Sequence, residues 1–242
     1  MPLQLMLYEI MLCITCYRPH AVFTFQCKHI SAPSIQSIFQ HDRLLRLNLS
    51  FSDVISDESF VLLHPATLPS SSPLSVSGKL EQLTLGMSSI SDVSLTRLAH
   101  AYSHSLHTLS LEWCNGITDA GVEVLVRHCS LLEDVNLKAC KGLSDASVRA
   151  IGRSCARLLR LNLSWCCDIT DTGILELTPA KLSACSRLQS LCVMWTQMTG
   201  ESLGMGGLQA LPDLREVKAD GCAGIASQYV SVFEQKGISL IL

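Results

Sequence analysis

Aspartate, cysteine and histidine are the residue types of this sequence that could do chemistry, and each recurs along the chain. Neighbouring carboxylates could act as general acid and base, and clusters of cysteine and histidine could bind a metal. Five aspartates share one setting, directly after a serine or threonine: Asp57, Asp92, Asp119, Asp145 and Asp171. A Ser/Thr-Asp pair that recurs in this way is typical of a turn before a helix, where it caps the helix. The recurrence therefore indicates capping and not acid–base catalysis.

Most of the 12 cysteines recur at two fixed positions. One series is Cys114, Cys140, Cys166 and Cys222, and the other is Cys129, Cys155 and Cys185. Such regular spacing predicts small, buried and reduced side chains, and not a disulfide framework. Cys13 and Cys16 form a single CxxC without the second ligand pair that a zinc site needs. Cys167 forms a vicinal pair with Cys166 that could be oxidised, but nothing beside it in the sequence would activate a thiolate.

The histidines do not complete a metal site. His100 and His104 could place two imidazoles on one helix face, but His107 falls in the next expected strand, and no glutamate or cysteine supplies a further ligand. The sequence has no glycine-rich phosphate loop, no G-x-S-x-G nucleophile elbow and no paired metal motif. We therefore predict no catalytic residue, no metal ligand and no cofactor, and a chain that is not an enzyme.

The elements that must position these residues form a repeat. The segment from Leu106 to Arg157 reads LHTLSLEWCNGITDAGVEVLVRHCSL and then LEDVNLKACKGLSDASVRAIGRSCAR. Leu106 is followed 26 residues later by Leu132, and Cys114 is followed at the same distance by Cys140. A fixed period with the same residue types at the same positions is the signature of a repeat protein.

Each repeat combines a short strand with a helix. Leu109 and Leu111 lie two residues apart, so both point to one face of a strand. The helical spacing of i, i+3, i+4 and i+7 is followed by Val122, Leu125, Val126 and Cys129. One strand and one helix cannot bury their own apolar faces, but stacked copies can. The sequence therefore predicts an α/β solenoid, with parallel strands on the concave face and helices on the convex face.

The pattern LxxLxLxxCxxITDxGLxxLxxxCxxL resembles the cysteine-containing leucine-rich repeat of F-box/LRR proteins. It is also similar to the repeat of the LRR-only homologues of the antagonist of mitotic exit network protein. The resemblance runs from Leu44 to the C-terminus, with a weaker extension to His20. It implies a leucine-rich-repeat horseshoe that recognises a protein. In F-box/LRR proteins the F-box holds the Skp adaptor, and the repeats hold the protein to be ubiquitinated.

The repeats divide the chain. We expect the repeat array to cover residues 20–242, with a degenerate repeat at 20–43 and further repeats that start near residues 44, 80, 106, 132, 158, 188 and 214. Residues 1–19 are apolar, but they lack a basic n-region and are too short to span a bilayer, so we predict neither a signal peptide nor an anchor. Residues 64–78 are a Pro/Ser-rich insertion, which we interpret as an exposed loop or as a phosphorylated regulatory segment.

The later repeats depart from the pattern. Pro179 should break or offset the helix of the repeat that starts at Leu158. The glycines of residues 204–207 should weaken the helix of the next repeat. Leu240 should begin one more strand at the end of the chain. An apolar last strand would be exposed in a complete solenoid, so we hypothesise a piece of a longer array, or an end that a partner covers.

Composition narrows the classes of partner. Among 242 residues, 48% are hydrophobic and 16% are charged, which excludes a disordered chain. The net charge is −3, with 18 basic and 21 acidic residues, and this argues against a nucleic-acid binder. No segment predicts a membrane span.

The partner-binding residues are expected on the strand face and at its edge. All three tryptophans of the chain, Trp113, Trp165 and Trp195, stand seven residues after the first leucine of their repeats. Aromatic residues flanked by charged ones have the composition of an interface core. The alternative is that these tryptophans only pack beside the buried cysteine. The residues that we predict to bind a partner are Phe51, Glu112, Trp113, Asp134, Lys138, Arg160, Trp165, Met194 and Trp195.

The resemblance implies the substrate-binding region of an SCF-type E3 ubiquitin ligase, with Skp and cullin subunits as further partners, in the cytoplasm or nucleus. Residues 1–43 contain no tryptophan and no Leu-Pro start, so they do not match an F-box. The alternative is a free-standing repeat scaffold or inhibitor. A small-molecule sensor is less favoured, because Arg46, Lys138, Arg160 and Lys218 are too dispersed to form a basic floor for an anionic ligand.

Overall fold

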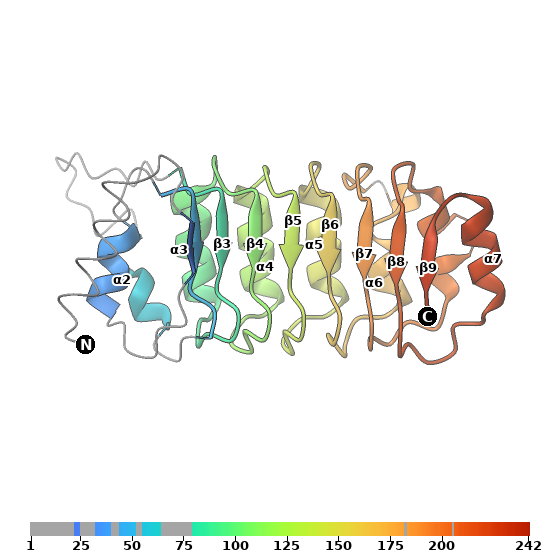
Figure 1. The fold of residues 1–242 in the computed structure, drawn as a ribbon, viewed down its shortest axis with the longest axis horizontal. Helices are drawn as coiled ribbons and strands as arrows, with labels where there is room; N and C mark the ends of the chain where they lie inside the picture. The colour runs from blue at the N-terminus through green and yellow to red at the C-terminus, as the bar shows by residue number, and fades with distance from the viewer. Residues whose placement is uncertain are drawn as a thin grey trace.

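Parallel strands stacked in chain order form the body of the molecule. The computed structural model describes residues 22–24, 32–39, 44–51, 55–63, 79–181, 183–204 and 206–242. Within these residues, nine strands form one sheet whose spatial order is the chain order, β1 to β9 (Figure 1). Residues 1–19, with Cys13 and Cys16, and the insertion 64–78 lie outside the described residues. Every pairing is parallel, as a solenoid of identical units requires.

The strands are short, with three residues each. Their bounds are β1 (Val22–Thr24), β2 (Arg46–Asn48), β3 (Gln82–Thr84), β4 (Thr108–Ser110), β5 (Asp134–Asn136), β6 (Arg160–Asn162), β7 (Ser190–Cys192), β8 (Glu216–Lys218) and β9 (Ser239–Ile241). The middle residue of each strand from β2 to β8 is the second leucine of its repeat, or a valine in its place. These middle residues pair in register and are buried, for example Leu109 against Val135.

The ladder between repeats continues past the formal strands. Leu111 donates its N–H to the carbonyl of Asn136, with an N···O distance of 2.8 Å, and Trp113 donates to the carbonyl of Lys138 at 2.8 Å. The same two bonds recur in the neighbouring repeats, such as Leu137 to Asn162 and Ala139 to Ser164. Backbone groups near the buried face are therefore satisfied by the next repeat along the chain.

Helices cover one face of the sheet, behind it in Figure 1. The α-helices are α2 (Ala32–Phe39), α3 (Asp92–Tyr102), α4 (Asp119–His128), α5 (Asp145–Ser154), α6 (Asp171–Leu175) and α7 (Gln228–Gln235). The 3-10 helices are η1 (Asp57–Leu63), η3 (Pro179–Lys181), η4 (Glu201–Leu203) and η5 (Leu208–Ala210). The expected departures are confirmed: α6 is short and is followed by η3 at Pro179, and 3-10 turns replace an α-helix around Gly204.

The end of the chain differs from the expected spacing. Leu240 was expected to open a strand, but it pairs with Val217 and so occupies the centre of β9. The last unit is therefore 23 residues long between equivalent positions. The reason lies in α7, which ends at Gln235 and is followed at once by Gly237, with φ of 72°. The left-handed glycine turns the chain directly into β9.

A single apolar core runs between the sheet and the helices. The repeat leucines, the helix residues at i, i+3 and i+4, and most of the repeat cysteines belong to it, while Cys222 is partly buried and packs against it. Cys114, Cys140 and Cys166 lie under the end of each strand, and each donates its Sγ–H to a carbonyl of the preceding repeat, as Cys140 does to Leu111 at 3.1 Å. The predicted α/β leucine-rich-repeat solenoid is confirmed.

Burial makes the repeat cysteines chemically inert. It raises the pKa of Cys129 to about 12 and, against opposing hydrogen bonds, that of Cys166 to about 11. The thiolate that would react or bind a metal is therefore scarce at neutral pH. The described cysteines are all free, as the regular spacing predicted, and Cys167 is exposed.

We expect native-state alkylation to separate Cys167 from its neighbour. At pH 8, iodoacetamide should modify Cys167 at least about tenfold faster than Cys166 or Cys140, because Cys167 is exposed to the reagent and the other two thiols are buried. Peptide mapping by mass spectrometry at successive times measures the rates. A Cys167→Ser variant is the control and should leave the slow labelling of Cys166 unchanged. Equal rates for Cys166 and Cys167 in the folded chain would contradict the buried position of Cys166.

Candidate functional site

The recurring aspartates link neighbouring repeats. Asp119 is the first residue of α4, and its carboxylate accepts hydrogen bonds from the N–H and hydroxyl of Ser144, at 2.9 and 2.7 Å. Ser144 is the N-cap of the next helix, α5. The helix of Asp119 itself is capped by Thr118, whose hydroxyl accepts from the N–H of Ala120. The capping prediction is therefore right at Ser91, Thr118, Ser144 and Thr170. The aspartate beside each of the first three, and Asp57, instead holds the cap of the following repeat.

A second position alternates between serine and glycine to accommodate these carboxylates. Ser147 donates both its N–H and its hydroxyl to Asp119. At the equivalent position of α4 stands Gly121, where a Cβ would lie 2.2 Å from an Asp92 carboxylate oxygen. Each carboxylate thus meets either additional donors or an empty space. The glycine in the first turn of α4 is explained by this contact.

These hydrogen bonds determine the charge state of the aspartates. Burial alone would raise the pKa of Asp119, but the donors of Ser144 and Ser147 outweigh it and lower the pKa below its ordinary value of 3.8. Burial would likewise raise the pKa of Asp171, but the hydrogen-bond donors of Ser202 and Thr199 lower that pKa below its ordinary value. A carboxylate held ionised by fixed donors is a structural acceptor and does not act as a general acid.

We expect the link at Asp119 to contribute to stability in a pH-dependent way. Because the folded pKa lies below the unfolded one, the contribution is complete above about pH 4 and is lost as pH falls through the folded pKa. At pH 7, Asp119→Asn should lower the free energy of unfolding by about 2 kcal/mol, since charged hydrogen bonds are lost. Urea unfolding measures this, and Asp168→Asn, at an exposed loop position, is the matched control. Equal loss in both variants would contradict the link.

A row of left-handed residues follows the strands. We call it the turn row: Phe51, Met87, Trp113, Ala139, Trp165, Trp195 and Gly221. Its φ angles lie between 57° and 72°, a region in which bulky residues are rare. Each turn-row residue that precedes another repeat donates its N–H to a carbonyl of that repeat. Directly after it the chain turns toward the core and buries the next side chain, which is a cysteine in most repeats. The left-handed conformation allows both. The side chain itself is left pointing outward.

The large side chains of the turn row are exposed in the described structure. Exposed fractions are 43% for Trp113, 42% for Trp165 and 51% for Trp195, and Phe51 and Met87 are similar. The tryptophans are therefore not fully packed beside the buried cysteines, and their exposed area is open to a partner. About half of each ring faces solvent at the carboxyl edge of the sheet.

Two tryptophans of the turn row touch. The rings of Trp165 and Trp195 stack with centroids 5.0 Å apart and planes 20° from parallel. Trp195 also lies over Gly221, where a Cβ would come within 2.5 Å of the indole. Ala139, 2% exposed, separates Trp113 from Trp165. The stack fixes the two rings against each other, which lowers the conformational entropy that a partner must remove.

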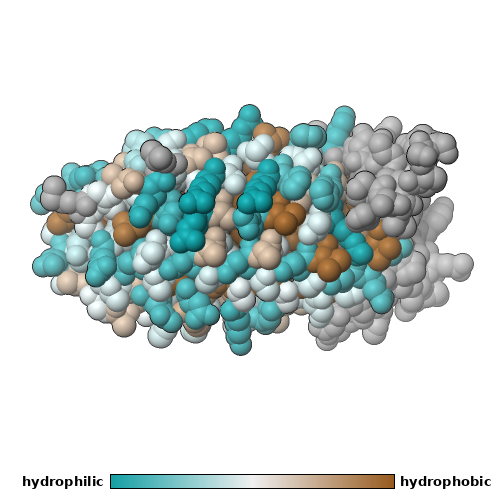
Figure 2. Space-filling view, turned by 180° about the vertical axis from the view of Figure 1, so that it is seen from behind, coloured by the Kyte–Doolittle hydropathy of each residue, from teal (hydrophilic) through white to brown (hydrophobic). Residues whose placement is uncertain are grey.

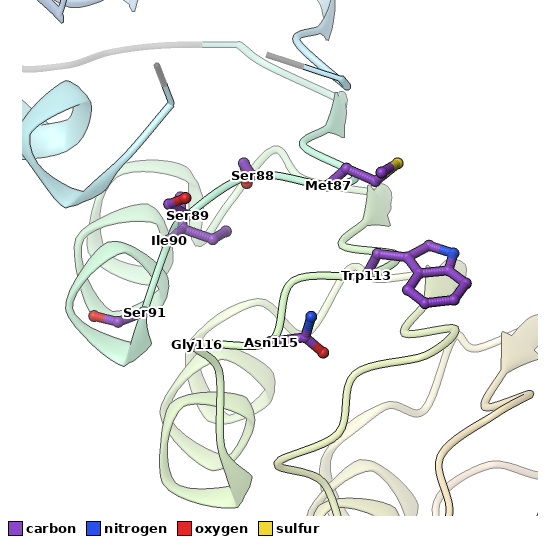
Figure 3. A pocket seen from close by; sticks show the side chains of 8 residues that line it. All are labelled: Met87, Ser88, Ser89, Ile90, Ser91, Trp113, Asn115 and Gly116. Carbon is purple, nitrogen blue, oxygen red and sulfur yellow. The ribbon is translucent and has the colours of Figure 1, made fainter. Parts of the chain in front are cut away.

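An open hollow adjoins the turn row. It has a volume of about 580 Å³ and lies between the loops that follow β3 and β4. In Figure 3, Met87 and Trp113 project from these two loops, while Ser89, Ile90 and Asn115 line the rest of the hollow. The hollow is wide enough for a side chain or turn of a protein partner, and its mouth is apolar. Asn115 and the serines were not predicted, since nothing in their spacing separates them from ordinary loop residues.

The remaining predicted residues lie on the strand face, and not all of them meet. Asp134 and Arg160 form an ion pair, with Nε and Oδ2 2.8 Å apart, across β5 and β6. Glu112 lies over Gly86, next to the hollow. Lys138 and Met194 are partly buried. The structure therefore brings Trp165 and Trp195 together and pairs Asp134 with Arg160, whereas Phe51 stands several strands away.

Asparagines on the strand face have a backbone role. The side chain of Asn136 accepts from the N–H of Lys138 at 3.1 Å, and that of Asn162 accepts from Ser164 at 3.0 Å. Each bond fixes the backbone immediately before the left-handed turn. The recurrence of asparagine at one repeat position was the signal for this role.

Comparison with known families supports the repeat assignment. The Leucine Rich repeat family matches residues 102–126 and 154–177. The fold is that of a leucine-rich-repeat solenoid. The two matched segments lie in two separate repeats of the array. The nine-stranded sheet of the described residues continues the same repeating unit on both sides of them. No curated protein sequence matches the chain.

Solved structures that match this chain include two complexes. The crystal structure of the yeast Rad7 and Elc1 complex matches 90% of this chain and 74% of the compared chain, with 15% identity and a TM-score of 0.42. The TLR13–ssRNA13 complex matches 80% of this chain and 27% of the compared chain, with 15% identity and a TM-score of 0.48. The identity is too low for either to bear on function.

The described residues contain neither a membrane-spanning helix nor a cluster of metal-binding side chains. None of the described helices is both long enough and apolar enough to cross a bilayer. No three histidine, cysteine, aspartate or glutamate side chains within the described part of the chain are grouped so as to hold a metal ion. The candidate site of this leucine-rich-repeat solenoid is the surface made by the turn row and the adjoining strand face.

Proposed function

We propose that this chain is a protein-recognition module that holds its partner along the turn row. The observation that carries the proposal is the exposure of Trp113, Trp165 and Trp195 in one row at the carboxyl edge of the sheet. Tryptophan is enriched at the energetic centres of interfaces, and its burial by a partner removes a large apolar area from water. A left-handed backbone at a bulky residue is costly, so repeated retention of aromatics there favours a role beyond folding.

The arrangement around the row suits a protein surface. The tryptophans form the apolar centre, and the pair Asp134–Arg160 and the residues Glu112 and Lys138 supply a polar surround. An apolar centre with a polar rim is the usual anatomy of an interface. The hollow beside Met87 and Trp113 offers a place for a projecting side chain of the partner.

We further propose that the partner is a substrate of an SCF-type ubiquitin ligase, delivered in the cytoplasm or nucleus for degradation. The support is the resemblance of the cysteine-containing repeat to that of F-box/LRR proteins. In this reading an F-box and its Skp and cullin partners act together with the repeats. A second candidate is a free-standing scaffold or inhibitor, and its support is the similarity of the repeat to that of the LRR-only homologues.

We expect the double variant Trp113→Ala, Trp165→Ala to lose its partner and keep its fold. Ala139 shows that the left-handed turn accommodates alanine. Binding should weaken by at least about 2 kcal/mol, since two half-exposed indoles are removed from the interface centre. The measurement is titration of the purified chain with its captured partner, with thermal unfolding recorded beside it. Unfolding of the variant, or unchanged affinity, would contradict partner binding by the turn row.

A matched capture experiment separates the two candidates. Tagged wild-type chain and the double tryptophan variant are recovered from lysate, and the bound proteins are identified by mass spectrometry. Skp and cullin subunits with both chains, and one further protein with wild type alone, would support ligase substrate recognition. A partner that depends on the tryptophans, recovered without Skp or cullin, would support the free-standing scaffold. Arg187→Ala, at an exposed position outside the turn row and its polar surround, controls for general surface change.

A further inference from the structure

The helix face opposite the turn row carries a second feature, which recognition by the sheet does not use. Seen from behind, the middle of the molecule shows a gathering of strongly hydrophilic side chains (Figure 2). A hollow of about 260 Å³ opens there between α4 and α5. Arg127 enters it from α4, and Arg149 and Arg153 enter it from α5. Three guanidinium groups from two neighbouring helices therefore surround one small space.

The carboxylates near the hollow do not balance these arginines. Arg127 pairs with Glu123 on its own helix, and Arg149 pairs with Glu176 at 3.1 Å. Among the described residues no ion pair is found for Arg153. The hollow therefore keeps a net positive charge in a chain whose formal net charge is −3. The local charge is thus opposite to that of the molecule as a whole.

The arrangement is also unfavourable for the helix by itself. Arg149 and Arg153 stand four residues apart on α5, a spacing at which like charges repel. Cations near a helix C-terminus offset the helix dipole, and this accounts for Arg153 in the last turn. Arg149 lies in the middle of α5, where the helix dipole does not stabilise it, and its one ion pair is with Glu176 of the next repeat. An anion between the two guanidinium groups would relieve the repulsion.

The chemistry of the hollow selects one class of anion. Guanidinium groups bind phosphate oxygens through paired, charge-assisted hydrogen bonds, and several arginines around one point are the usual way to recognise a phosphorylated side chain. The floor is made of Ala146 and Ala150, which leave room for the group, and Ser154 adds a hydroxyl at one end. A nucleic acid would need an extended basic stripe, whereas Glu123 and Glu176 border this hollow closely.

We propose that the hollow between α4 and α5 binds a single phosphate group, carried by a phosphorylated serine or threonine of a protein partner. The existing pair of Arg127 and Glu123 is no obstacle, because both side chains are largely exposed and such pairs contribute little. A dianionic phosphate draws Arg127 away from Glu123 and engages Arg149 and Arg153 together. This inference does not rest on partner binding by the turn row, since it concerns the opposite face.

The test uses the intact chain with two probes, inorganic phosphate and a labelled phosphoserine peptide, and with the unphosphorylated peptide as reference. Nuclear magnetic resonance of the arginine Nε–H groups follows phosphate, and fluorescence anisotropy follows the peptides. The expected result is a saturable shift of the Arg149 and Arg153 signals. The phosphopeptide should bind at least about tenfold tighter than its unphosphorylated form, the effect of one or two charge-assisted hydrogen bonds.

Three variants make the result specific to the hollow. Arg153→Ala should remove most of the phosphopeptide preference, whereas Arg187→Ala, an exposed arginine outside the hollow, should keep it. Glu123→Gln should strengthen binding several-fold, because a competing carboxylate is removed. The double tryptophan variant should bind the phosphopeptide like wild type, which distinguishes this site from the proposed partner surface. Equal binding of both peptides, or equal loss in the Arg153 and Arg187 variants, would overturn the proposal.

Discussion

The turn after each strand is the constraint on which the rest of this solenoid depends. One residue there must donate its N–H to the next repeat while the chain reverses toward the core, and only a left-handed backbone satisfies both demands. The consequence on the inside is a buried side chain, Cys140 or Cys166, directly after the turn. The consequence on the outside is an exposed side chain at a fixed place in nearly every repeat. Stacking and surface display therefore follow from the same backbone conformation.

Polar links then hold the repeats in register behind the sheet. Asp119 reaches from the start of one helix to the cap of the next, and the serine or glycine at the facing position either donates to the carboxylate or gives it room. Each repeat is thus incomplete without its successor, both in its backbone ladder and in its carboxylate. Nearest-neighbour dependence of this kind is expected for a quasi-one-dimensional array.

Much of this arrangement could be predicted from the sequence, because the repeat makes each position appear several times. The recurrence of Leu109, Val122 and Cys114 at the repeat period indicated a strand, a helix and a buried position, because their spacings fit a stack of strand–helix units. The forward reach of Asp119 could not be predicted, because a carboxylate after a Ser/Thr has the same spacing whether it caps its own helix or the next. The left-handed backbone at Trp113 could not be predicted either, because glycine, the usual residue for this conformation, occurs in the turn row only at Gly221. The arginine hollow depends on Arg127 and Arg149 meeting across two helices, a contact that requires the packed structure.

The central claim is that the turn row is a preformed, solvent-facing surface that a partner covers. All three tryptophans of the chain belong to this row, so tryptophan fluorescence reports on the row alone. The most direct measurement is tryptophan emission and acrylamide quenching, before and after addition of the captured partner. The account predicts red-shifted, readily quenched emission in the free chain, and a blue shift with loss of quenching on binding. Emission typical of buried indoles in the free chain, unchanged by the partner, would contradict it.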